Sequence, residues 1–313
     1  MPTPFFGYHI SSFTFPGVAA ADLFEHVVGL AVAAEDAGFD MVTVMDHFYQ
    51  IANIGPETEP MLEAYTTLGA LSQRTRRVAL SALVTGVTYR NPALLAKQVT
   101  TLDILSGGRA ILGLGAAWNE DEHHGYGFEF PSVGRRLDRL AEALQIARKL
   151  FTEERPSFSG KYYTIDRALN VPRPVQVGGP RIMVGGGGEQ RTLRLVARYA
   201  DISNWFGTAE DMRRKGDLLE RYCAEVDRDP SEILRTAMAP LLLVTSRQEA
   251  DELSQRIPPE RLRSLGAPMT PEQAAAALGP YLAVGIRGFT FSNANLHSPE
   301  LIAAAGELKA LLS

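Results

Sequence analysis

The sequence predicts an α/β fold of the (β/α)8 TIM-barrel type. Short apolar runs rich in Val, Ile, Leu and Phe alternate with longer stretches of helical period along the chain, which is the pattern of repeated strand–helix units. Eight such runs occur without a break in composition, and eight units favour a closed barrel over an open doubly wound sheet, which needs fewer strands. A chain of 313 residues has the length of two average domains or of one barrel, and we expect a single domain over residues 1–313.

The eight predicted strands are separated by intervals long enough for a helix. They are Phe5–Ile10, Asp40–Met45, Val78–Thr85, Ala110–Gly115, Ile182–Gly185, Asp201–Asn204, Ala237–Val244 and Gly288–Ser292.

Helices are expected after the strands. Over Ala21–Gly38 the apolar residues recur at helical spacing, and Gly38 is suited to cap the C-terminus. After the third strand, Asn91 is placed to cap a helix that begins at Pro92. A further helix is expected over Glu189–Tyr199.

Two long connections interrupt this rhythm. The first, about 156–180, contains "FSGKYYTI" and the proline-rich "NVPRPVQVGGP", which indicates a hairpin and a loop rather than a helix. The second covers about 257–270. We interpret both as insertions into the barrel.

Composition excludes several classes of protein. The net charge of −5 provides no basic field for nucleic acid. A single cysteine excludes an intrachain disulfide and a thiolate metal cluster. The chain shows neither an export signal nor an uninterrupted apolar run of about eighteen residues, so we expect a cytoplasmic protein that does not enter a membrane.

A glycine-rich loop follows the fifth predicted strand, in the stretch "IMVGGGGEQ". Active sites of TIM barrels lie at the C-terminal ends of the strands, and glycine lets a ligand approach backbone amides near a helix N-terminus. The loop lacks the Lys-Ser/Thr pair of a P-loop. It suits either a phosphate grip or a tight turn.

Polar side chains also follow three other strands. Asp46 and His47 follow the second strand, and an imidazole there is suited to proton transfer near neutral pH. Arg90, after the third strand, suits either an acidic ligand group or a structural salt bridge. Trp118 and Asn119, after the fourth, offer a flat apolar surface and an amide beside an aromatic ring system.

The adjacent residues Asp121, Glu122, His123 and His124 invite comparison with a metal site. Consecutive residues point in different directions, however, and no second cluster has the matching spacing of a motif such as H-E-x-x-H. We therefore expect no metal and interpret this segment as a solvated polar loop.

Three stretches taken together resemble a known family. "GFDMVTVMDHF", "LVTGVTYRNPALLAKQVTTLDILSGGRAILGLGAAWNEDE" and "VGGGGEQRTLRLVARYADISNW" resemble the bacterial luciferase-like monooxygenase superfamily, and within it the oxidoreductases that use the deazaflavin coenzyme F420. The resemblance is strong as far as about Trp205 and weaker afterwards. It implies a barrel with an insertion, a flavin-type cofactor across the strand ends, hydride transfer to or from a small-molecule substrate, and a homodimer.

The resemblance also implies roles for particular residues. The cofactor phosphate would be held by Gly186, Gly187, Gly188 and Glu189. A non-prolyl cis peptide would fall at Gly86–Val87, next to Thr85 and under the deazaflavin ring. Asn119 and Asn204 would contact the cofactor. His47, oriented by Asp46, would donate or accept the proton.

The remaining expectations concern the substrate and the choice of cofactor. Tyr8, His9, Phe48, Tyr49 and Trp118 suit either an aromatic substrate pocket or a second layer of the core. The sugar-phosphate and alcohol dehydrogenases of the branch carry a glutamate at the fourth strand end, where this chain has Ala117 or Trp118 and, nearby, Glu120.

Two alternatives share the same scaffold: an FMNH2-dependent monooxygenase and a non-catalytic flavin-binding protein. The longer acidic tail of F420 favours nearby cations, and Arg181, Arg191 and Arg194 flank the glycine-rich loop.

Overall fold

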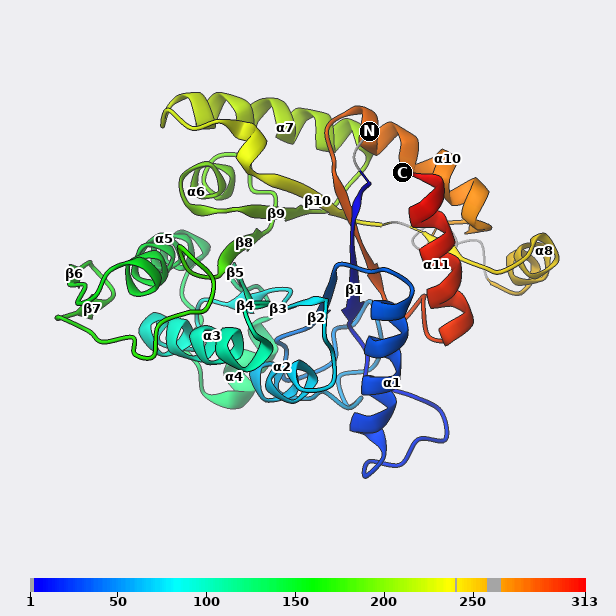
Figure 1. Cartoon of the computed structure of the whole chain (residues 1–313), viewed down its shortest axis with the longest axis horizontal. Helices are drawn as coiled ribbons and strands as arrows, with labels where there is room; N and C mark the ends of the chain where they lie inside the picture. The colour runs from blue at the N-terminus through cyan, green and yellow to red at the C-terminus, as the bar shows by residue number, and fades with distance from the viewer. Residues whose placement is uncertain (1–2, 240, 258–265) are drawn as a thin grey trace.

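A parallel β-barrel forms the centre of the molecule. The computed structural model describes residues 3–239, 241–257 and 266–313, and Figure 1 shows the strands surrounded by helices. The barrel sheet has the order β3-β2-β1-β13-β10-β9-β8-β5-β4. Its strands are β1 (Phe5–Ile10), β2 (Met41–Val44), β3 (Ala79–Ala82), β4 (Thr85–Gly86), β5 (Ile111–Gly115), β8 (Arg181–Gly185), β9 (Ile202–Trp205), β10 (Leu234–Met238) and β13 (Gly288–Ser292).

The nine strands form an eight-stranded barrel because β3 and β4 are two successive pieces of one barrel strand. A bridge between Leu80 and Ala110 joins β3 to β5 and nearly closes the barrel. The predicted TIM-barrel class is confirmed within the described residues, and every neighbouring pair in the barrel sheet is parallel.

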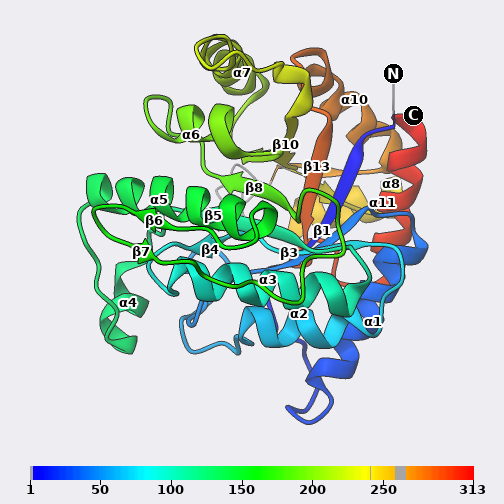
Figure 2. The same cartoon turned by 60° about the vertical axis from the view of Figure 1, so that its left-hand side comes forward.

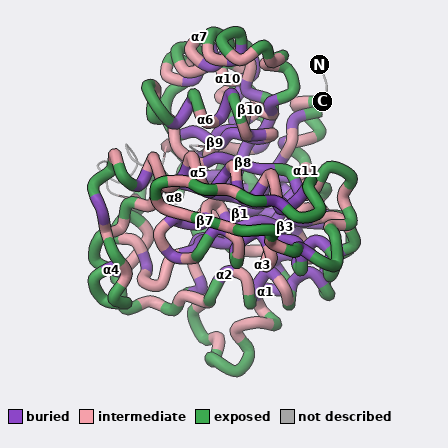
Figure 3. The backbone as a smooth tube through the Cα atoms, turned by 90° about the vertical axis from the view of Figure 1, so that its left-hand side faces the viewer, coloured by how far each residue is buried: buried purple, intermediate pink, exposed green. Residues whose placement is uncertain are grey.

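Helices cover the outside of the barrel, as the exposed outer tube and the buried strands in Figure 3 show. They are α1 (Leu23–Asp36), α2 (Ala64–Ser72), α3 (Pro92–Ser106), α4 (Glu120–Tyr126), α5 (Val133–Thr152), α6 (Thr192–Tyr199), α7 (Ala209–Ala224), α8 (Arg247–Arg256), α10 (Pro271–Ala283) and α11 (Pro299–Leu311), with a 3-10 turn at Pro230–Glu232. In the described part of the chain, no helix is long and apolar enough to cross a membrane.

Helix ends follow the sequence signals closely. Asn91 caps α3 by accepting hydrogen bonds from the backbone amides of Ala93 and Leu94, and Pro92 is its first residue. Gly38 follows α1 with a φ of +84°, a conformation that glycine adopts without steric cost. These local predictions are confirmed because capping depends only on neighbouring residues.

The first insertion contains the predicted hairpin, which Figure 2 shows outside the barrel beside α5 and α3. Its strands are β6 (Phe158–Ser159) and β7 (Thr164–Ile165), paired antiparallel. Glu142 of α5 holds the turn by accepting hydrogen bonds from the amides of Lys161, Tyr162 and Tyr163.

The second expected insertion, about 257–270, falls partly outside the described residues. Its described end contains β12 (Pro268–Met269), which pairs with β11 (Leu242–Leu243) in a small separate sheet.

Two strand predictions and the expected position of the cis peptide need correction. The third barrel strand is interrupted after Ala82 and resumes at Thr85. The non-prolyl cis peptide lies in this interruption, at Leu83–Val84, three residues before the expected Gly86–Val87. The seventh strand begins at Leu234 instead of Ala237. The later residues of that prediction belong in part to β11, because strands buried on both faces show no alternation that would mark their ends.

The alternation of side chains along β1 decides which residues enter the barrel. Phe6, Tyr8 and Ile10 are fully buried in the core between strands and helices. A side chain at Gly7 would instead point toward Met41 and Thr290, on the other face of the strand. Met41, Ile111, Met183 and Ile202 form a separate apolar cluster. His9 therefore faces inward and Tyr8 outward.

Candidate active site

A cavity of about 1060 Å³ opens at the C-terminal ends of the strands, where active sites of TIM barrels lie. Each of the eight barrel strands, or the loop that follows it, contributes residues to the wall of the cavity. It is lined by these predicted site residues: His9, Asp46, His47, Thr85, Gly86, Trp118, Gly186 and Asn204.

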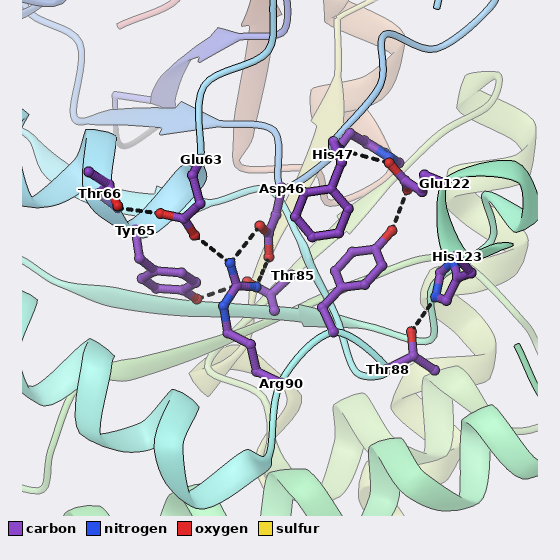
Figure 4. Close-up of polar contacts among 12 residues, drawn as sticks. Asp46, His47, Glu63, Tyr65, Thr66, Thr85, Thr88, Arg90, Glu122 and His123 are labelled. Atoms are coloured by element: carbon purple, nitrogen blue, oxygen red, sulfur yellow. Dashed lines mark hydrogen bonds and ion pairs between the residues drawn. The ribbon is translucent and has the colours of Figure 1, made fainter. Parts of the chain in front are cut away.

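His47 is held by a residue that sequence reasoning did not select. Its Nδ1 lies 2.7 Å from Oε1 of Glu122, which projects from α4 and is fully buried (Figure 4). An ionised carboxylate only accepts hydrogen bonds, so Nδ1 carries the proton. Since the imidazole lines the cavity, Nε2 is the nitrogen available to a substrate.

Two further donors fix Glu122. The hydroxyl of Tyr89 donates to Oε1, and the backbone N–H of Phe48 donates to Oε2 at 2.8 Å. Burial alone would raise the pKa of Glu122, but hydrogen bonds from His47, Tyr89 and Phe48 outweigh it and hold the pKa below its usual range. Glu122 is therefore ionised at neutral pH and orients His47.

Asp46 does not orient His47, contrary to the sequence-based expectation. Its two carboxylate oxygens accept hydrogen bonds from Arg90 at 2.5 and 3.0 Å, and Arg90 also contacts Glu63 at 2.6 Å (Figure 4). Burial would lower the pKa of Arg90, but the Asp46 and Glu63 carboxylates raise it above its usual value. The structural salt bridge is thus the correct alternative for Arg90.

His9 is a second imidazole in the cavity. It is nearly buried, and its Nδ1 lies 2.8 Å from the hydroxyl oxygen of Thr43. Burial, together with the nearby His47, lowers the pKa of His9 to about 3. His9 is neutral at physiological pH and presents a hydrogen-bonding nitrogen without charge.

The glycine-rich loop lies on the opposite side of the barrel mouth from His9. Gly186 has a φ of +104°, and it lines the cavity with Gly185, Thr192 and Asn204. Its N–H donates to the carbonyl of Asn204 at 3.2 Å. The loop leads into the N-terminus of α6, where Thr192 begins the helix.

The rest of this loop faces away from the cavity lining. Gly187 lies against Lys215 of α7, whose Nζ donates to the carbonyl of Phe206 at 2.7 Å. Glu189 pairs with Nε of Arg214 at 2.7 Å. Lys215 is a cation beside the loop that the sequence reasoning missed, because it lies 28 residues after Gly187, in α7.

Asn204 forms part of the cavity floor. Its Nδ2 donates to the hydroxyls of Thr236 at 2.9 Å and Thr290 at 3.3 Å, which fixes the amide in one orientation. Asn119, its predicted counterpart, caps α4 outside the cavity lining, where its carbonyl lies 2.5 Å from His123 Nδ1.

Three residues of the predicted aromatic pocket lie elsewhere. Tyr8 is buried in the outer core, and its hydroxyl donates to the carbonyl of Leu296. Phe48 stacks on Tyr126, and Tyr49 also packs on Tyr126, outside the cavity lining. Tyr8 faces outward because of the alternation along β1, and Phe48 and Tyr49 lie in a bend immediately after His47.

Trp118 lines the cavity beside His47. It is 60% exposed at the mouth, and its ring meets His47 edge to face with 5.4 Å between centroids. Val87, by contrast, is buried outside the cavity lining, and its N–H donates to Gly115.

The acidic segment after the fourth strand is a helix and not a solvated loop. Glu122 and His123 are fully buried, whereas Glu120 and His124 are exposed. Glu120, the nearby carboxylate that sequence reasoning considered, points away from the site. No group of three or more metal-ligating side chains occurs among the described residues.

The three arginines expected near an acidic cofactor tail do not line the cavity. Arg191 pairs with Asp138, and Arg194 pairs with Glu225. Arg181 begins β8, at the end of the strand opposite the cavity. They therefore give no reason to prefer one cofactor.

Comparisons with known proteins agree with this geometry. The luciferase-like monooxygenase family profile matches residues 5–302. An F420-dependent glucose-6-phosphate dehydrogenase of Amycolatopsis mediterranei is 30% identical over 297 residues, covering 85% of this chain and 87% of that protein. The protein of the same name from Kribbella flavida is 32% identical over 295 residues, covering 84% and 86%.

Two solved structures have the same fold. An F420-dependent secondary alcohol dehydrogenase, in complex with an F420–acetone adduct, superimposes with a TM-score of 0.81 at 21% identity over 99% of each chain. A long-chain alkane monooxygenase superimposes with a TM-score of 0.81 at 15% identity over 100% of this chain and 93% of that one.

Proposed function

The chain belongs to the luciferase-like monooxygenase family, and from this premise we propose that it is an F420-dependent oxidoreductase. It transfers a hydride between C5 of the deazaflavin and a small organic substrate. The relatives at 30% and 32% identity, both named F420-dependent dehydrogenases, support this assignment. The direction that we propose is reduction of a C=C, C=N or C=O bond.

One observation carries the proposal: an oriented imidazole and a glycine cradle face the same cavity. The cavity volume of about 1060 Å³ is at the upper limit for one drug-sized ligand, roughly 1,000 Å³, so it has room for a cofactor with a substrate. Thr192, at the start of α6, would hold the phosphate, and Gly185 and Gly186 would let it approach because they have no side chains. Lys215 beside the loop adds a positive charge.

The ring of the cofactor would lie over the ends of β3, β4 and β5. Leu83, Val84, Thr85 and Gly86 line this part of the cavity, and Ala116 and Ala117 face them. Small and apolar side chains there leave room for a planar ring system. The residues present thus fit the cofactor.

The protein's own contribution is orientation and proton transfer. When bound, F420 supplies a hydride carrier that reacts poorly with oxygen. In the proposed direction of reduction, His47 would give a proton from Nε2 to the atom at the other end of the bond that receives the hydride, and in the reverse direction it would take that proton at Nε2, because Glu122 keeps the proton of the other nitrogen on Nδ1. Glu122 also stabilises the imidazolium that forms when Nε2 gains a proton.

The decisive experiment is a comparison of cofactors. Purified apoprotein is titrated separately with F420 and with FMN while the quenching of each cofactor's fluorescence is followed. We expect saturable binding of F420 and weaker binding of FMN. Preferred binding of FMN, with oxygen consumption coupled to FMNH2, would replace the proposal with a monooxygenase; binding of neither would leave the glycine loop as a simple turn.

We also propose that residues 1–313 act as one unit, that the protein is a cytoplasmic homodimer, and that it binds neither nucleic acid nor membrane. Exposed apolar side chains on α3 and the following insertion, among them Leu94, Leu105 and Val171, support a protein partner there. Light scattering coupled to size-exclusion chromatography tests the oligomeric state.

A further inference from the structure

We propose that the substrate of this enzyme is neutral and largely apolar, and that it binds in the half of the barrel mouth formed by β2, β1, β13 and β10. This inference rests on the proposed function and names its substrate class. It is supported by an apolar wall that lines the same cavity as His47. This wall consists of Ile51, Ile54, Leu241, Leu242 and Ile257.

The order of the strands divides the mouth into two halves. The adjacent strands β4, β5, β8 and β9, with the loops that follow them, carry the glycine-rich loop and the small residues suited to the cofactor. The other neighbours, β10, β13, β1 and β2, carry the apolar wall: Ile51 and Ile54 follow β2, and Leu241 and Leu242 follow β10. His9 and His47 belong to this second half.

The polar groups between the two parts of the wall bond to one another. Ser11 Oγ lies 2.5 Å from Ser292 Oγ, and Asn293 Oδ1 accepts hydrogen bonds from the amides of Ser11 and Ser12 at 2.9 and 3.0 Å. Asn295 donates to the carbonyl of Leu241 at 3.2 Å. A sugar needs a partner for each buried hydroxyl; these groups already bond to one another, and Asn53, between the two isoleucines, adds an exposed amide to the wall.

Charge in the described lining also favours a neutral ligand. Asp46 is paired with Arg90, which Glu63 also contacts, so this cluster offers no free positive charge to an anion, and His9 is held uncharged. Arg256, at the exposed end of α8, is the cation in the described part of the lining. A phosphate monoester carries nearly two negative charges, and sites for it combine bidentate arginines or several donors. The described wall therefore differs from a sugar-phosphate site, although two relatives carry that activity in their names.

The test is direct binding to the cofactor-loaded protein. F420-saturated protein is titrated by calorimetry with a series of neutral methyl ketones, from 2-butanone to 2-decanone, and with glucose 6-phosphate. We expect the dissociation constant to fall about fourfold for each added methylene, equivalent to ~0.8 kcal/mol, until the wall is covered. Glucose 6-phosphate should bind more weakly than the longest ketone.

A variant pair assigns the effect to the wall. Ile54→Asn should reduce the gain per methylene at least twofold, whereas Ile104→Asn, the same change on the surface of α3, should leave the series unchanged. If Ile54→Asn does not fold, Ile54→Val should weaken binding of the longest ketone by up to about fourfold. All variants should keep the wild-type affinity for F420.

The outcomes separate the two proposals. Failure of the wild type to bind F420 would overturn the proposed function. Normal F420 binding with a flat ketone series, or tighter binding of glucose 6-phosphate than of 2-decanone, would overturn the apolar-substrate inference alone.

Discussion

At the scale of single residues, the carboxylate of Glu122 decides which nitrogen of His47 can react. Both oxygens of Glu122 accept hydrogen bonds, and His47 Nδ1 supplies one of them. A glutamine at this position offers one acceptor and one donor, so it can no longer both orient His47 and stabilise its charged form.

Glu122→Gln should therefore lower turnover about tenfold or more, and His47→Ala should lower it by about 10²-fold or more. The pH profile of kcat/KM should shift in the glutamine variant, which a purely structural role would not produce. Glu120→Gln, two residues earlier on the exposed side of α4, is the matched control and should behave like the wild type. An unchanged rate for His47→Ala, with intact F420 binding, would exclude the imidazole as the proton carrier.

His9 makes stability depend on pH. Its pKa of about 3 in the folded protein lies below the ordinary 6.5, so the unfolded chain binds the proton more readily between these values. The contribution of His9 is therefore complete above pH 6.5 and is lost as the pH falls, by about 1.4 kcal/mol for each pH unit.

Urea unfolding at pH 7.5 and 5.5 measures this contribution. The wild type should lose about 1.4 kcal/mol more than His9→Asn between these two values. Equal losses in the two proteins would mean that His9 is accessible to protons in the folded state.

At the scale of elements, one carboxylate connects α1 to the turn before β3. Glu35 is nearly buried at the end of α1 and accepts hydrogen bonds from the amides of Arg76, Arg77 and Val78 at 2.9, 2.5 and 3.0 Å. Burial would raise the pKa of Glu35, but these backbone donors outweigh it and lower the pKa. The ionised form is thus stabilised above its ordinary pKa, and this stability disappears as acid protonates Glu35.

Glu35→Gln should lower the free energy of unfolding by about 1–3 kcal/mol at pH 7, since the amide group repels one or more of the backbone donors. Asp36→Asn is the control, because Asp36 is exposed and pairs with Arg77 at the surface; its effect should stay within about 0.5 kcal/mol. If urea unfolding gives the same loss of unfolding free energy for both variants, Glu35 does not stabilise the junction between α1 and the turn before β3.

At the scale of the whole molecule, the cofactor should stabilise the fold through the glycine loop. Saturation at about 100 times the dissociation constant adds ~2.7 kcal/mol. Gly186→Val should abolish the F420-dependent rise in Tm, because a φ of +104° is strained for valine and because the added side chain would stand in the cavity wall where the phosphate is proposed to bind.

The control substitutes a glycine with similar backbone geometry. Gly178→Val, with a φ of +81° and no heavy atom within 4 Å of the added Cβ, should lower Tm by strain but keep the rise with F420. A normal F420 response in Gly186→Val would place the phosphate elsewhere.

The sequence by itself determined the features that depend on near neighbours. The alternation of apolar runs and helical periods predicts the barrel, and Asn91, Pro92 and Gly38 mark helix ends where the structure has them. The family motifs likewise selected His47 and Gly186, which both line the cavity. These features are local because capping, turns and periodicity are fixed by residues within one or two helical turns.

The tertiary structure alone decided which side chains meet. Glu122 and His47 are 75 residues apart in the sequence, and Arg90 and Asp46 are 44 residues apart. A shift of α4 by one residue would direct a different titratable side chain toward His47. On β1, both faces are buried, so the choice of His9 over Tyr8 for the cavity depends on how the strand is set in the barrel. Pairings of this kind follow from the relative placement of whole strands and helices, which is fixed only when the barrel closes.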